Sequence, residues 1–589
     1  MPSITTQVFE RLEVAKHAHG STRDGDLSKT FSLLKSQVIR DAESLIRLHE
    51  TLLFLRAYPP SPRILNQVES ILKTFEQRVS QLRASDVDLS PLDDPEVSGI
   101  AGTTVTSNFS YEIVRWLVTK HSREIEIDWD WFEEEDRFGA TMRRFLPLLE
   151  EDAMVEAHVP YREWLRAAKS RNDELAWIIE RFGSRDRKPA RSADRSELRI
   201  RLEKQKAELY DSLKLHVQWD FSFRASRTGM KLPGRKIFFH DEPLIKRRDV
   251  SLIAKLGSPP IAAQKLSRAE GERILDMARE TSAVRYRELH GFTCGDSRRM
   301  LKANLGRGVD IFVMGVPPQH RLPLRAYTAA LIFKNGVPVA YFEGLSVFER
   351  MESGFNLFYT FREGETAWLF SRVLRLMRQL LRVTVFSIDP YQIGHENEEG
   401  IESGAFWFYR KLGFRPVLPE LMKLALAEEK KIAANARYRT PAKTLRKLAA
   451  GHMLFEGPPS VPASAGMSHS RAANKWDRFQ VRNVGLAVQR RMAGDFDGHA
   501  NRIQQASLDY VARALGIDPR AWNLSELETL NNLSLVLAMI PGMNRWSGED
   551  KRLAASIIRA KAGNDERRYL RLMQMHEPLR EAIIKLGSA

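Results

Sequence analysis

Apolar residues return at helical spacing through the first part of the chain. In "LSKTFSLLKSQVIRDAESLIRLHETLLFLRAY", leucine, isoleucine and valine recur every three or four positions, which places them on one face of a helix. Pro59, Pro60 and Pro62 end this run, and "RILNQVESILKTFEQRVSQL" begins a second amphipathic pattern. Residues 85–108 have the composition of a loop, and then "YEIVRWLVTKH", "YREWLRAAK" and "ELAWIIERF" predict more helices. The chain is therefore predicted to begin with helical regions.

The pattern changes near residue 260. "SRAEGERILDMARETSAVRYREL" predicts a helix with Ser267 as its N-cap. "AYTAALIFKNGVPVAYFEGLSVF" predicts two strands joined at Asn335-Gly336, because a type I′ hairpin turn needs positive φ at both central positions. "GFNLFYTF" and "RVTVFSID" predict two more strands, with a helix over "ETAWLFSRVLRLMRQLL" between them. A polar loop, a helix over "ESGAFWFYRKL" and a strand starting at "GFRPVL" complete a predicted α/β unit over about 262–420.

Helical patterns return after this unit. Residues 421–450 are a basic helix, "EGPPSVPASAGMSHSRAANK" has the composition of a linker, and the pattern is helical from about 480, with a capping-box signature from Ser547 to Asp550. The predicted fold class is multidomain α and α/β, a central mixed α/β domain flanked by N-terminal and C-terminal all-helical regions. The predicted divisions are a helical region at 1–84, a helical domain with a loop-rich start at 85–184, a basic linker and charged helix at 185–261, the α/β domain at 262–420, a basic helix and Pro/Ser/Ala-rich linker at 421–479, and a helical domain at 480–589.

Composition narrows the class of protein. The single cysteine, Cys294, excludes an internal disulfide and cysteine-held zinc or iron–sulfur centres. No apolar run approaches the roughly 20 residues of a membrane-spanning helix, and the first residues show no signal-peptide pattern, so we expect no membrane span and a cytoplasmic location. The net charge of +16 suits nucleic acid, an anionic membrane surface or an anionic cofactor, or it marks a solvated arginine-rich surface.

The segment "ESGAFWFYRKLGF" carries a resemblance to a known family. Many members of the GNAT acyltransferase superfamily end their central domain with Asn-x-x-Ala-x-x-Leu-Tyr-x-Lys-x-Gly-Phe, and the order of predicted elements over about 160 residues also resembles that superfamily. The matching positions are Ala405, Tyr409, Lys411, Gly413 and Phe414, whereas Glu402 replaces the asparagine and Phe408 the leucine. The resemblance implies a GNAT-like domain that uses acetyl-CoA or another acyl-CoA as co-substrate, with an amine as acceptor and no metal.

Tyr409 has two interpretations. A helix that ends at Leu412 needs a left-handed residue to close its last carbonyls, and Gly413 adopts that conformation at low steric cost. Tyr409 lies one turn earlier, where it either faces a cleft or simply packs into the core. The resemblance implies the first interpretation, with Tyr409 as the general acid that protonates the leaving thiolate.

The segment "FREGETA", over Phe361–Ala367, precedes the long helix, and the resemblance implies that it binds the pyrophosphate of acyl-CoA. Exposed backbone N–H groups at a helix N-terminus make an anion site there. The family form is Gln/Arg-x-x-Gly-x-Gly/Ala, and Arg362 and Ala367 match it, whereas Glu365 replaces the glycine. An ordinary acidic first turn of a helix explains the segment equally well. The residues predicted to bind the co-substrate are Leu357, Phe358, Tyr359 and Thr360, whose backbone would hold thioester and pantetheine, and Phe361, Arg362, Glu363, Gly364, Glu365, Thr366 and Ala367, which would hold the pyrophosphate.

The acidic loop "SIDPYQIGHENEEGIES" follows the fourth strand of the unit. Asp389 stands at the strand end, where active-site residues of open α/β sheets tend to lie. We predict that Asp389 and Glu402 face the amine acceptor, and the alternative is a solvated loop.

Three functions of different classes remain open from the sequence. The first is an acyl-CoA-dependent N-acyltransferase acting on a small amine, a protein lysine or an aminoacyl group. The second is a catalytically inactive GNAT-like binding or scaffold protein, with a protein partner on its helical flanks. The third is a nucleic-acid-associated protein, indicated only by the basic stretches 185–206 and 423–447; the second of these has one aromatic residue, Tyr438, and equally suits a solvated helical face.

Overall fold

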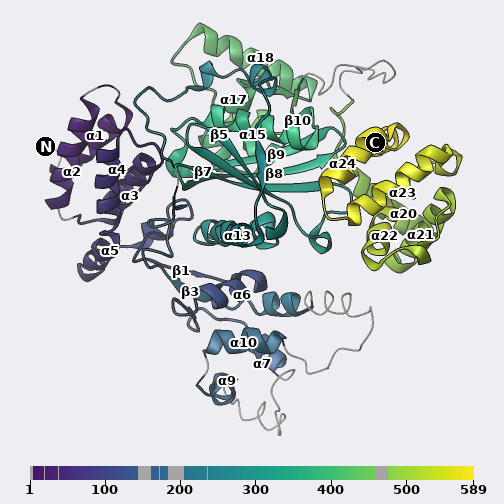
Figure 1. Ribbon diagram of the computed structural model, residues 1–589, viewed down its shortest axis with the longest axis horizontal. Helices are drawn as coiled ribbons and strands as arrows, with labels where there is room; N and C mark the ends of the chain where they lie inside the picture. The colour runs from purple at the N-terminus through teal and green to yellow at the C-terminus, as the bar shows by residue number, and fades with distance from the viewer. Residues whose placement is uncertain are drawn as a thin grey trace.

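The computed structural model describes residues 4–18, 20, 22–36, 39–142, 161–171, 173–183, 205–234, 236–457 and 475–588. A large mixed sheet lies at the centre, with the N-terminal helices beyond one end of it and the C-terminal helices beyond the other (Figure 1). A smaller α/β part hangs below the sheet in the same view. The predicted class, mixed α/β with helical regions on both sides, is confirmed at this level.

The central sheet contains nine strands among the described residues, in the order β11-β12-β10-β9-β8-β7-β6-β5-β4. All neighbours run antiparallel except β9 and β10, which are parallel and are joined through the helix α15 (Thr366–Leu381). The strands are β4 (Ala263–Lys265), β5 (Leu301–Gly306), β6 (Val309–Met314), β7 (Ala326–Lys334), β8 (Val337–Val347), β9 (Arg350–Leu357), β10 (Val385–Ile388), β11 (Arg415–Pro416) and β12 (Met453–Glu456).

Tight turns with left-handed backbone fix the hairpins of this sheet. Asn335 (φ 50°) and Gly336 (φ 82°) join β7 to β8, which confirms the predicted type I′ turn. Arg307 (φ 51°) and Gly308 (φ 74°) join β5 to β6 in the same way. The β5–β6 hairpin was not predicted, although "GRGVD" between two strand-like runs carries the same kind of signal.

The two faces of the sheet are covered by different helices. Helix α13 (Arg268–Ala283) packs on one face and α15 on the other (Figure 1). The short helix α14 (His290–Thr293) accompanies α13, and α12 (Leu252–Leu256) accompanies α15. Ser267 caps α13 in a capping box with Glu270, as predicted. Alternating side chains of β6 and β7 therefore reach two separate cores; Phe312 and Leu331 belong to the α13 side.

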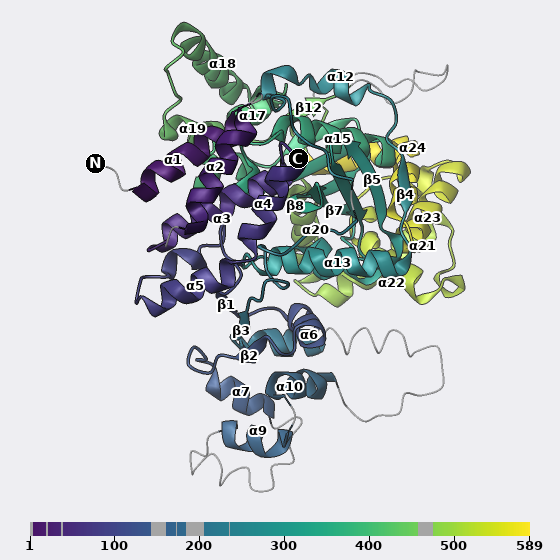
Figure 2. The ribbon, with the colours of Figure 1, turned by 60° about the vertical axis from the view of Figure 1, so that its left-hand side comes forward.

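The N-terminal region is a helical bundle that packs on the α15 side of the sheet. Its buried leucines share one core with α15, and Figure 2 brings this contact to the front. The helices are α1 (Ile4–His17), α2 (Arg23–Ser36), α3 (Ala42–Ala57), α4 (Pro62–Leu72) and α5 (Phe75–Ala84). The prediction of helices over 1–84 agrees with these elements.

The region predicted as a helical domain at 85–184 also contains strands. It forms a three-stranded antiparallel sheet in the order β1-β3-β2, in which β3 comes from the segment predicted as basic linker and charged helix. The elements are β1 (Thr104–Ser107), α6 (Tyr111–Lys120), β2 (Ile125–Ile127), α7 (Glu135–Met142), α9 (Tyr161–Lys169), α10 (Glu174–Gly183) and β3 (Val217–Asp220). Three or four residues per strand are too few for an alternating pattern to stand out. Most of the basic stretch 185–206 lies outside the described residues.

The region after residue 420 extends the sheet as well as the helices. After α16 (Glu398–Glu402) and α17 (Ala405–Arg410), the helices α18 (Pro419–Ala434) and α19 (Ala442–Leu448) form a hairpin, and β12 then pairs with both β10 and β11. The α/β domain therefore reaches residue 456 rather than 420. The C-terminal helices are α20 (Val481–Phe496), α21 (Ala500–Leu515), α22 (Leu524–Leu537), α23 (Gly548–Ala562), α24 (Glu566–Met575) and α25 (Glu577–Gly587). As predicted, the Ser547 side chain accepts the N–H of Asp550 and caps α23.

Across the described ranges, we find no helix with the length and apolar character needed to span a membrane.

The Asn335-Gly336 turn generates a stability prediction. A Cβ added at Gly336 would lie 2.8 Å from the Leu232 carbonyl oxygen, so Gly336→Ala meets a steric clash in addition to the cost of positive φ. We expect a loss of about 2 kcal/mol in the free energy of unfolding, measured by urea denaturation. The control is Gly516→Ala, where φ is 67° and nothing lies within 4 Å of the added Cβ. Equal losses in the two variants would show that the contact with Leu232 contributes nothing.

Candidate functional site

The two parallel strands separate partway along the sheet. β9 and β10 are paired only from Arg350↔Val385 to Glu352↔Ser387, whereas β9 continues to Leu357 with β8 as its partner. Because successive residues of a strand direct their backbone groups to opposite sides, alternate residues of 353–357 point N–H and C=O groups into the opening. Among the described residues, no strand pairs with this edge. The Ser353 hydroxyl is buried beside it without a hydrogen-bond partner in the same ranges. Beyond Glu352, β9 thus has one edge without a strand partner among the described residues.

Tyr409 lies on α17 on the α15 side of this opening. Its ring contacts Phe370, Phe408 and Phe414, and Phe370 in turn contacts Phe355 of β9 with 5.2 Å between ring centroids. Tyr409 is 4% exposed, and burial raises the pKa of its phenol above the ordinary value, so it keeps its proton at neutral pH. The structure therefore shows the second interpretation, a ring packed in the core, and Phe370 lies between this ring and Phe355 of β9.

The end of α17 follows the predicted pattern. Gly413 has φ of 101°, and the N–H of Phe414 donates to the Tyr409 carbonyl at 3.2 Å. This left-handed turn fixes the helix that carries Tyr409 against the strand that follows.

Glu365, the residue that replaces the expected glycine, is buried within the loop between β9 and α15. It is 2% exposed and pairs with Arg307 at 2.6 Å and with Lys334 at 3.6 Å, and it accepts the N–H of Ile245 at 3.1 Å. Burial lowers the pKa of Lys334 to about 7, so the Arg307 guanidinium is the main counter-charge. The carboxylate is therefore neutralised by the β5–β6 turn, and it does not add an unpaired negative charge to the loop.

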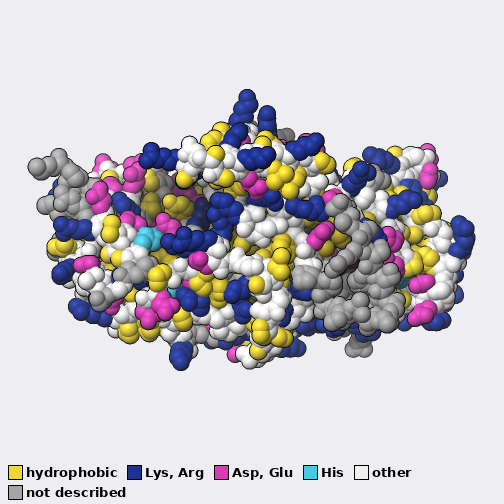
Figure 3. All heavy atoms as spheres, turned by 90° about the horizontal axis from the view of Figure 1, so that it is seen from above, with side chains coloured by type: hydrophobic (Ala, Val, Ile, Leu, Met, Phe, Trp, Pro, Cys, Tyr) yellow, Lys and Arg dark blue, Asp and Glu magenta, His cyan; other side chains and the backbone are white. Residues whose placement is uncertain are grey.

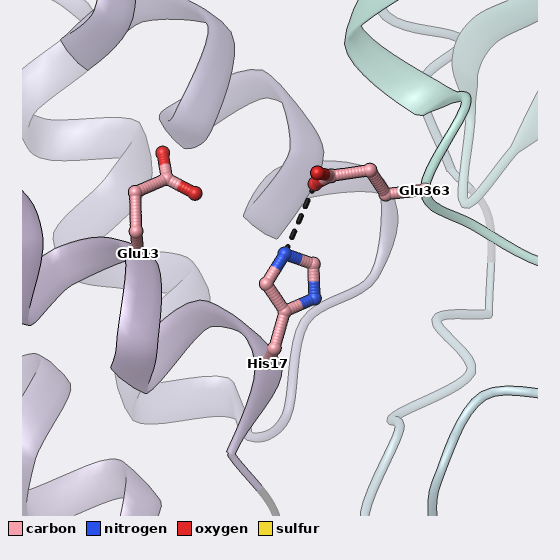
Figure 4. A group of neighbouring side chains, drawn as sticks. All are labelled: Glu13, His17 and Glu363. Carbon is pink, nitrogen blue, oxygen red and sulfur yellow. Dashed lines mark hydrogen bonds and ion pairs between the residues drawn. The ribbon is translucent and has the colours of Figure 1, made fainter. Parts of the chain in front are cut away.

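The N-terminal helices cover the same loop. The Glu363 carboxylate accepts hydrogen bonds from Lys16 at 2.7 Å and lies 3.0 Å from the His17 ring (Figure 4). A Cβ at Gly364 would lie 2.5 Å from the Tyr58 hydroxyl, and the backbone of Glu365 forms a hydrogen bond with that hydroxyl. The predicted pyrophosphate-binding loop is thus in contact with α1 and α3.

The other residues predicted to bind the co-substrate divide by burial. Arg362 pairs with Glu399 and lies 3.4 Å from Glu96, so its charge is already compensated. Tyr359 is 53% exposed, and Thr366 begins α15. Buried in the core are Leu357, Phe358, Thr360, Phe361 and Ala367.

Glu50 is the buried charge at the junction of the N-terminal bundle and the loop. It accepts hydrogen bonds from Arg227 and Thr360, and its Oε1 lies 2.8 Å from the His49 ring. Burial opposes the charged form, but Arg227 and the hydrogen bonds outweigh it and lower the pKa of Glu50 to about 2. Burial lowers the pKa of His49, so its ring stays neutral and links Glu50 to the Thr228 hydroxyl at 2.9 Å.

An acidic pair and a histidine lie at the point where the strands separate. Glu352 of β9, Asp389 after β10 and His452 before β12 place ligand atoms within 4.8 Å of one another. Burial first, and then the Asp389 charge, raises the pKa of Glu352. Burial and the Arg350 charge lower the pKa of His452 to about 4, so this ring is neutral. The sequence did not indicate Glu352 or His452, because β12 brings in His452 from outside the predicted domain.

Among the residues that the structure describes, two groups have the geometry to hold a metal ion, and cations already balance both. Arg325 lies 3.4 Å from Glu352, next to Asp389 and His452. In the other group, Glu13, His17 and Glu363, the Lys16 ammonium lies 3.6 Å from Glu13 and 2.7 Å from Glu363.

The three predicted catalytic residues are not all brought together. Asp389 caps the turn over Pro390–Ile393 by accepting the N–H of Tyr391 at 2.9 Å, and it lies beside Glu352. Glu402 is exposed on α16, and no ion pair or hydrogen bond joins it to Asp389 or Tyr409 within the described ranges. The prediction that Glu402 faces the same site as Asp389 finds no support in these contacts.

A cavity of about 250 Å³ lies away from the sheet opening, at the start of α6. The carboxylates of Asp211 and Glu288 line it, and they accept the N–H groups of Tyr111 at 2.8 Å and Ser110 at 2.7 Å. Both acids therefore cap the helix N-terminus.

No family model, curated protein or solved structure matches this chain.

The Glu50 network generates a pH-dependent stability prediction. Because the folded state lowers the pKa of Glu50 from its ordinary 4.5 to about 2, its stabilisation is complete above pH 4.5 and is lost as the pH falls toward 2. Glu50→Gln leaves Arg227 buried without a charged partner, and we expect a cost of about 3 kcal/mol in unfolding free energy at pH 7.

Denaturant unfolding at pH 7, 4 and 3 measures this cost. The difference between the native protein and Glu50→Gln should shrink as the pH falls, whereas Glu43→Gln, an exposed change on the same helix, should stay near zero. A difference that does not vary with pH would mean that the Glu50 charge does not stabilise the junction.

Proposed function

We propose that the central domain transfers an acyl group from a phosphopantetheine thioester, as in acetyl-CoA or another acyl-CoA, to an amine. The observation that carries this proposal is the separation of β9 from β10 beside the helix of Tyr409. An opened parallel pair offers a free backbone edge at the centre of a folded sheet, where an extended thiol arm can be held against a proton donor. This agrees with the resemblance to GNAT acyltransferases in "ESGAFWFYRKLGF".

The donor side of the site consists mainly of backbone. The amides of a pantetheine arm match the N–H and C=O groups that residues 353–357 point into the opening. The N-terminus of α15 lies at the end of that edge and adds a positive dipole. Since Arg307 neutralises Glu365, no unpaired carboxylate of the loop opposes a phosphate there.

Tyr409 fits the role of general acid. Amine attack on the thioester carbonyl expels a thiolate, which needs a proton. A tyrosine phenol holds its proton at neutral pH, and a thiolate is basic enough to accept it.

Glu352 fits the role of base better than the predicted Asp389. An attacking amine must lose a proton, and the raised pKa of the Glu352 carboxyl group makes it a better proton acceptor for that transfer. Asp389 and the neutral His452 lie beside Glu352 as further polar groups that an amine can contact. The acceptor is thus proposed to approach from the side of Glu352.

The loop between β9 and α15, which α1 and α3 cover, favours a second candidate, a GNAT-like binding protein without turnover. In that case Tyr58 and Glu363 hold the loop closed permanently, and the helical flanks serve a protein partner. The two candidates differ in one observable, the release of free thiol.

A thiol-release assay with Tyr409→Phe tests the proposal. With acetyl-pantetheine or acetyl-CoA and a panel of amines, the native protein should release thiol in step with amide formation. Tyr409→Phe should lower kcat by about 100-fold or more, because a positioned general acid contributes that much. The matched control is Tyr391→Phe, at a tyrosine that is 54% exposed, which should keep the native rate. A folded protein that releases no thiol with any donor would favour the binding protein instead.

A further inference from the structure

The structure helps to identify the molecule that carries the donor thioester. We propose that the acyl group is delivered on a small acidic carrier protein bearing a phosphopantetheine arm, which docks on the α18–α19 hairpin. This inference rests on the proposed acyl transfer and specifies its donor. Two independent observations carry it: the covered loop at the start of α15, and the uncompensated charge of the hairpin.

The covered loop disfavours a free nucleotide donor. A coenzyme diphosphate needs the backbone N–H groups at the start of α15, but the Tyr58 hydroxyl packs against Gly364 and bonds to the backbone of Glu365. Lys16 and His17 hold Glu363 at the same place. A carrier-bound arm has no adenosine diphosphate, so it needs the opened edge of β9 and leaves this loop in contact with the N-terminal helices.

The hairpin presents positive charge that the described residues neutralise only in part. It projects from the top of the molecule in Figures 1 and 2, and Figure 3, viewed from above, shows Lys and Arg side chains mixed with apolar ones over the same area. Lys431 pairs with Glu428, and Arg446 pairs with Glu398. Within the described part of the chain, no carboxylate pairs with the exposed Lys423, Lys430, Arg437, Arg439, Lys443 or Lys447.

Exposed apolar side chains accompany this charge. Leu426 of α18 is 43% exposed, and Leu418 just before the helix is 38% exposed. A basic surface with apolar residues within it matches an acidic protein surface, because the charges steer the encounter and the apolar side chains are buried on contact.

The hairpin is joined directly to the proposed catalytic helix. The Trp407 indole, two residues before Tyr409, donates to the Thr440 hydroxyl at 3.2 Å. Lys411 follows the end of α17, and its pKa is lowered first by burial and then by the nearby positive charges of Arg247 and Arg439. A carrier bound on the hairpin therefore lies beside the end of the helix that positions Tyr409.

The transfer step balances without another reactant. The amine nitrogen forms a bond to the thioester carbonyl carbon, and the bond from that carbon to sulfur breaks. The departing thiolate takes the Tyr409 proton, and the amine proton passes to Glu352. The products are the amide and the carrier with a free thiol, and solvent returns the Tyr409 proton and removes the one on Glu352.

The full-length chain tests the proposal with three donors of the same acyl group: a phosphopantetheinylated acyl carrier protein, acyl-CoA and acyl-pantetheine. We expect kcat/KM to be at least tenfold higher for the carrier than for acyl-CoA, and this preference to fall with added salt. The double variant Lys430→Glu/Lys443→Glu should reduce the ratio of kcat/KM for the carrier over that for acyl-pantetheine at least tenfold. Arg490→Glu/Arg513→Glu, which makes the same change in net charge on exposed residues of α20 and α21, should leave the ratio unchanged.

The outcomes separate this inference from the proposed function. If acyl-CoA is as good a donor as the carrier, the carrier proposal is wrong while acyl transfer stands. The same holds if the ratio does not change in Lys430→Glu/Lys443→Glu. No thiol release from any of the three donors overturns both. Binding of RNA or of anionic lipid vesicles that depends on Lys430 and Lys443, with no binding of the carrier, assigns the hairpin to that polyanion and overturns the inference.

Discussion

The arrangement of this protein depends on the pairing of the buried Glu50 carboxylate with charged and hydrogen-bonding partners. A carboxylate removed from water is costly unless charged and hydrogen-bonded partners surround it, and here each partner comes from a different segment. His49 precedes it on α3, Arg227 comes from the segment after β3, and Thr360 belongs to the turn after β9. Any displacement of the N-terminal bundle would leave both Glu50 and Arg227 buried and unpaired, so these segments must keep one mutual position.

That fixed position determines the state of the loop before α15. With α3 in place, Tyr58 fills the space beside Gly364, and α1 holds Glu363 through Lys16 and His17. The buried Glu365 is balanced from the opposite side by Arg307 of the β5–β6 turn. The loop before α15 thus becomes the interface between two regions, and the edge of β9 beyond Glu352 has no strand partner among the described residues.

The open edge separates two chemical environments. On the α15 side, aromatic rings enclose Tyr409 and keep its phenol protonated. At the start of the opening, Glu352 and Asp389 share a charged cluster with Arg325 and His452. The proposed acyl transfer assigns proton donation to the first environment and proton acceptance to the second.

The sequence by itself determined the turns, caps and helix ends that depend only on residues near one another in the chain. The Asn335-Gly336 turn, the Ser267 cap, the left-handed Gly413 and the order of helices and strands around them follow from φ preferences, capping hydrogen bonds and periodic apolar positions that neighbouring residues share. The sequence also predicted Tyr409 and Asp389 as site residues, and that prediction is carried into the proposed function. It did not indicate β5, β6, β12 or the short strands β1–β3, and it gave no sign of Glu352 with His452, or of Tyr58 against Gly364. Those pairings depend on strand partners and packed faces that are far apart in sequence, so only the tertiary structure decided them.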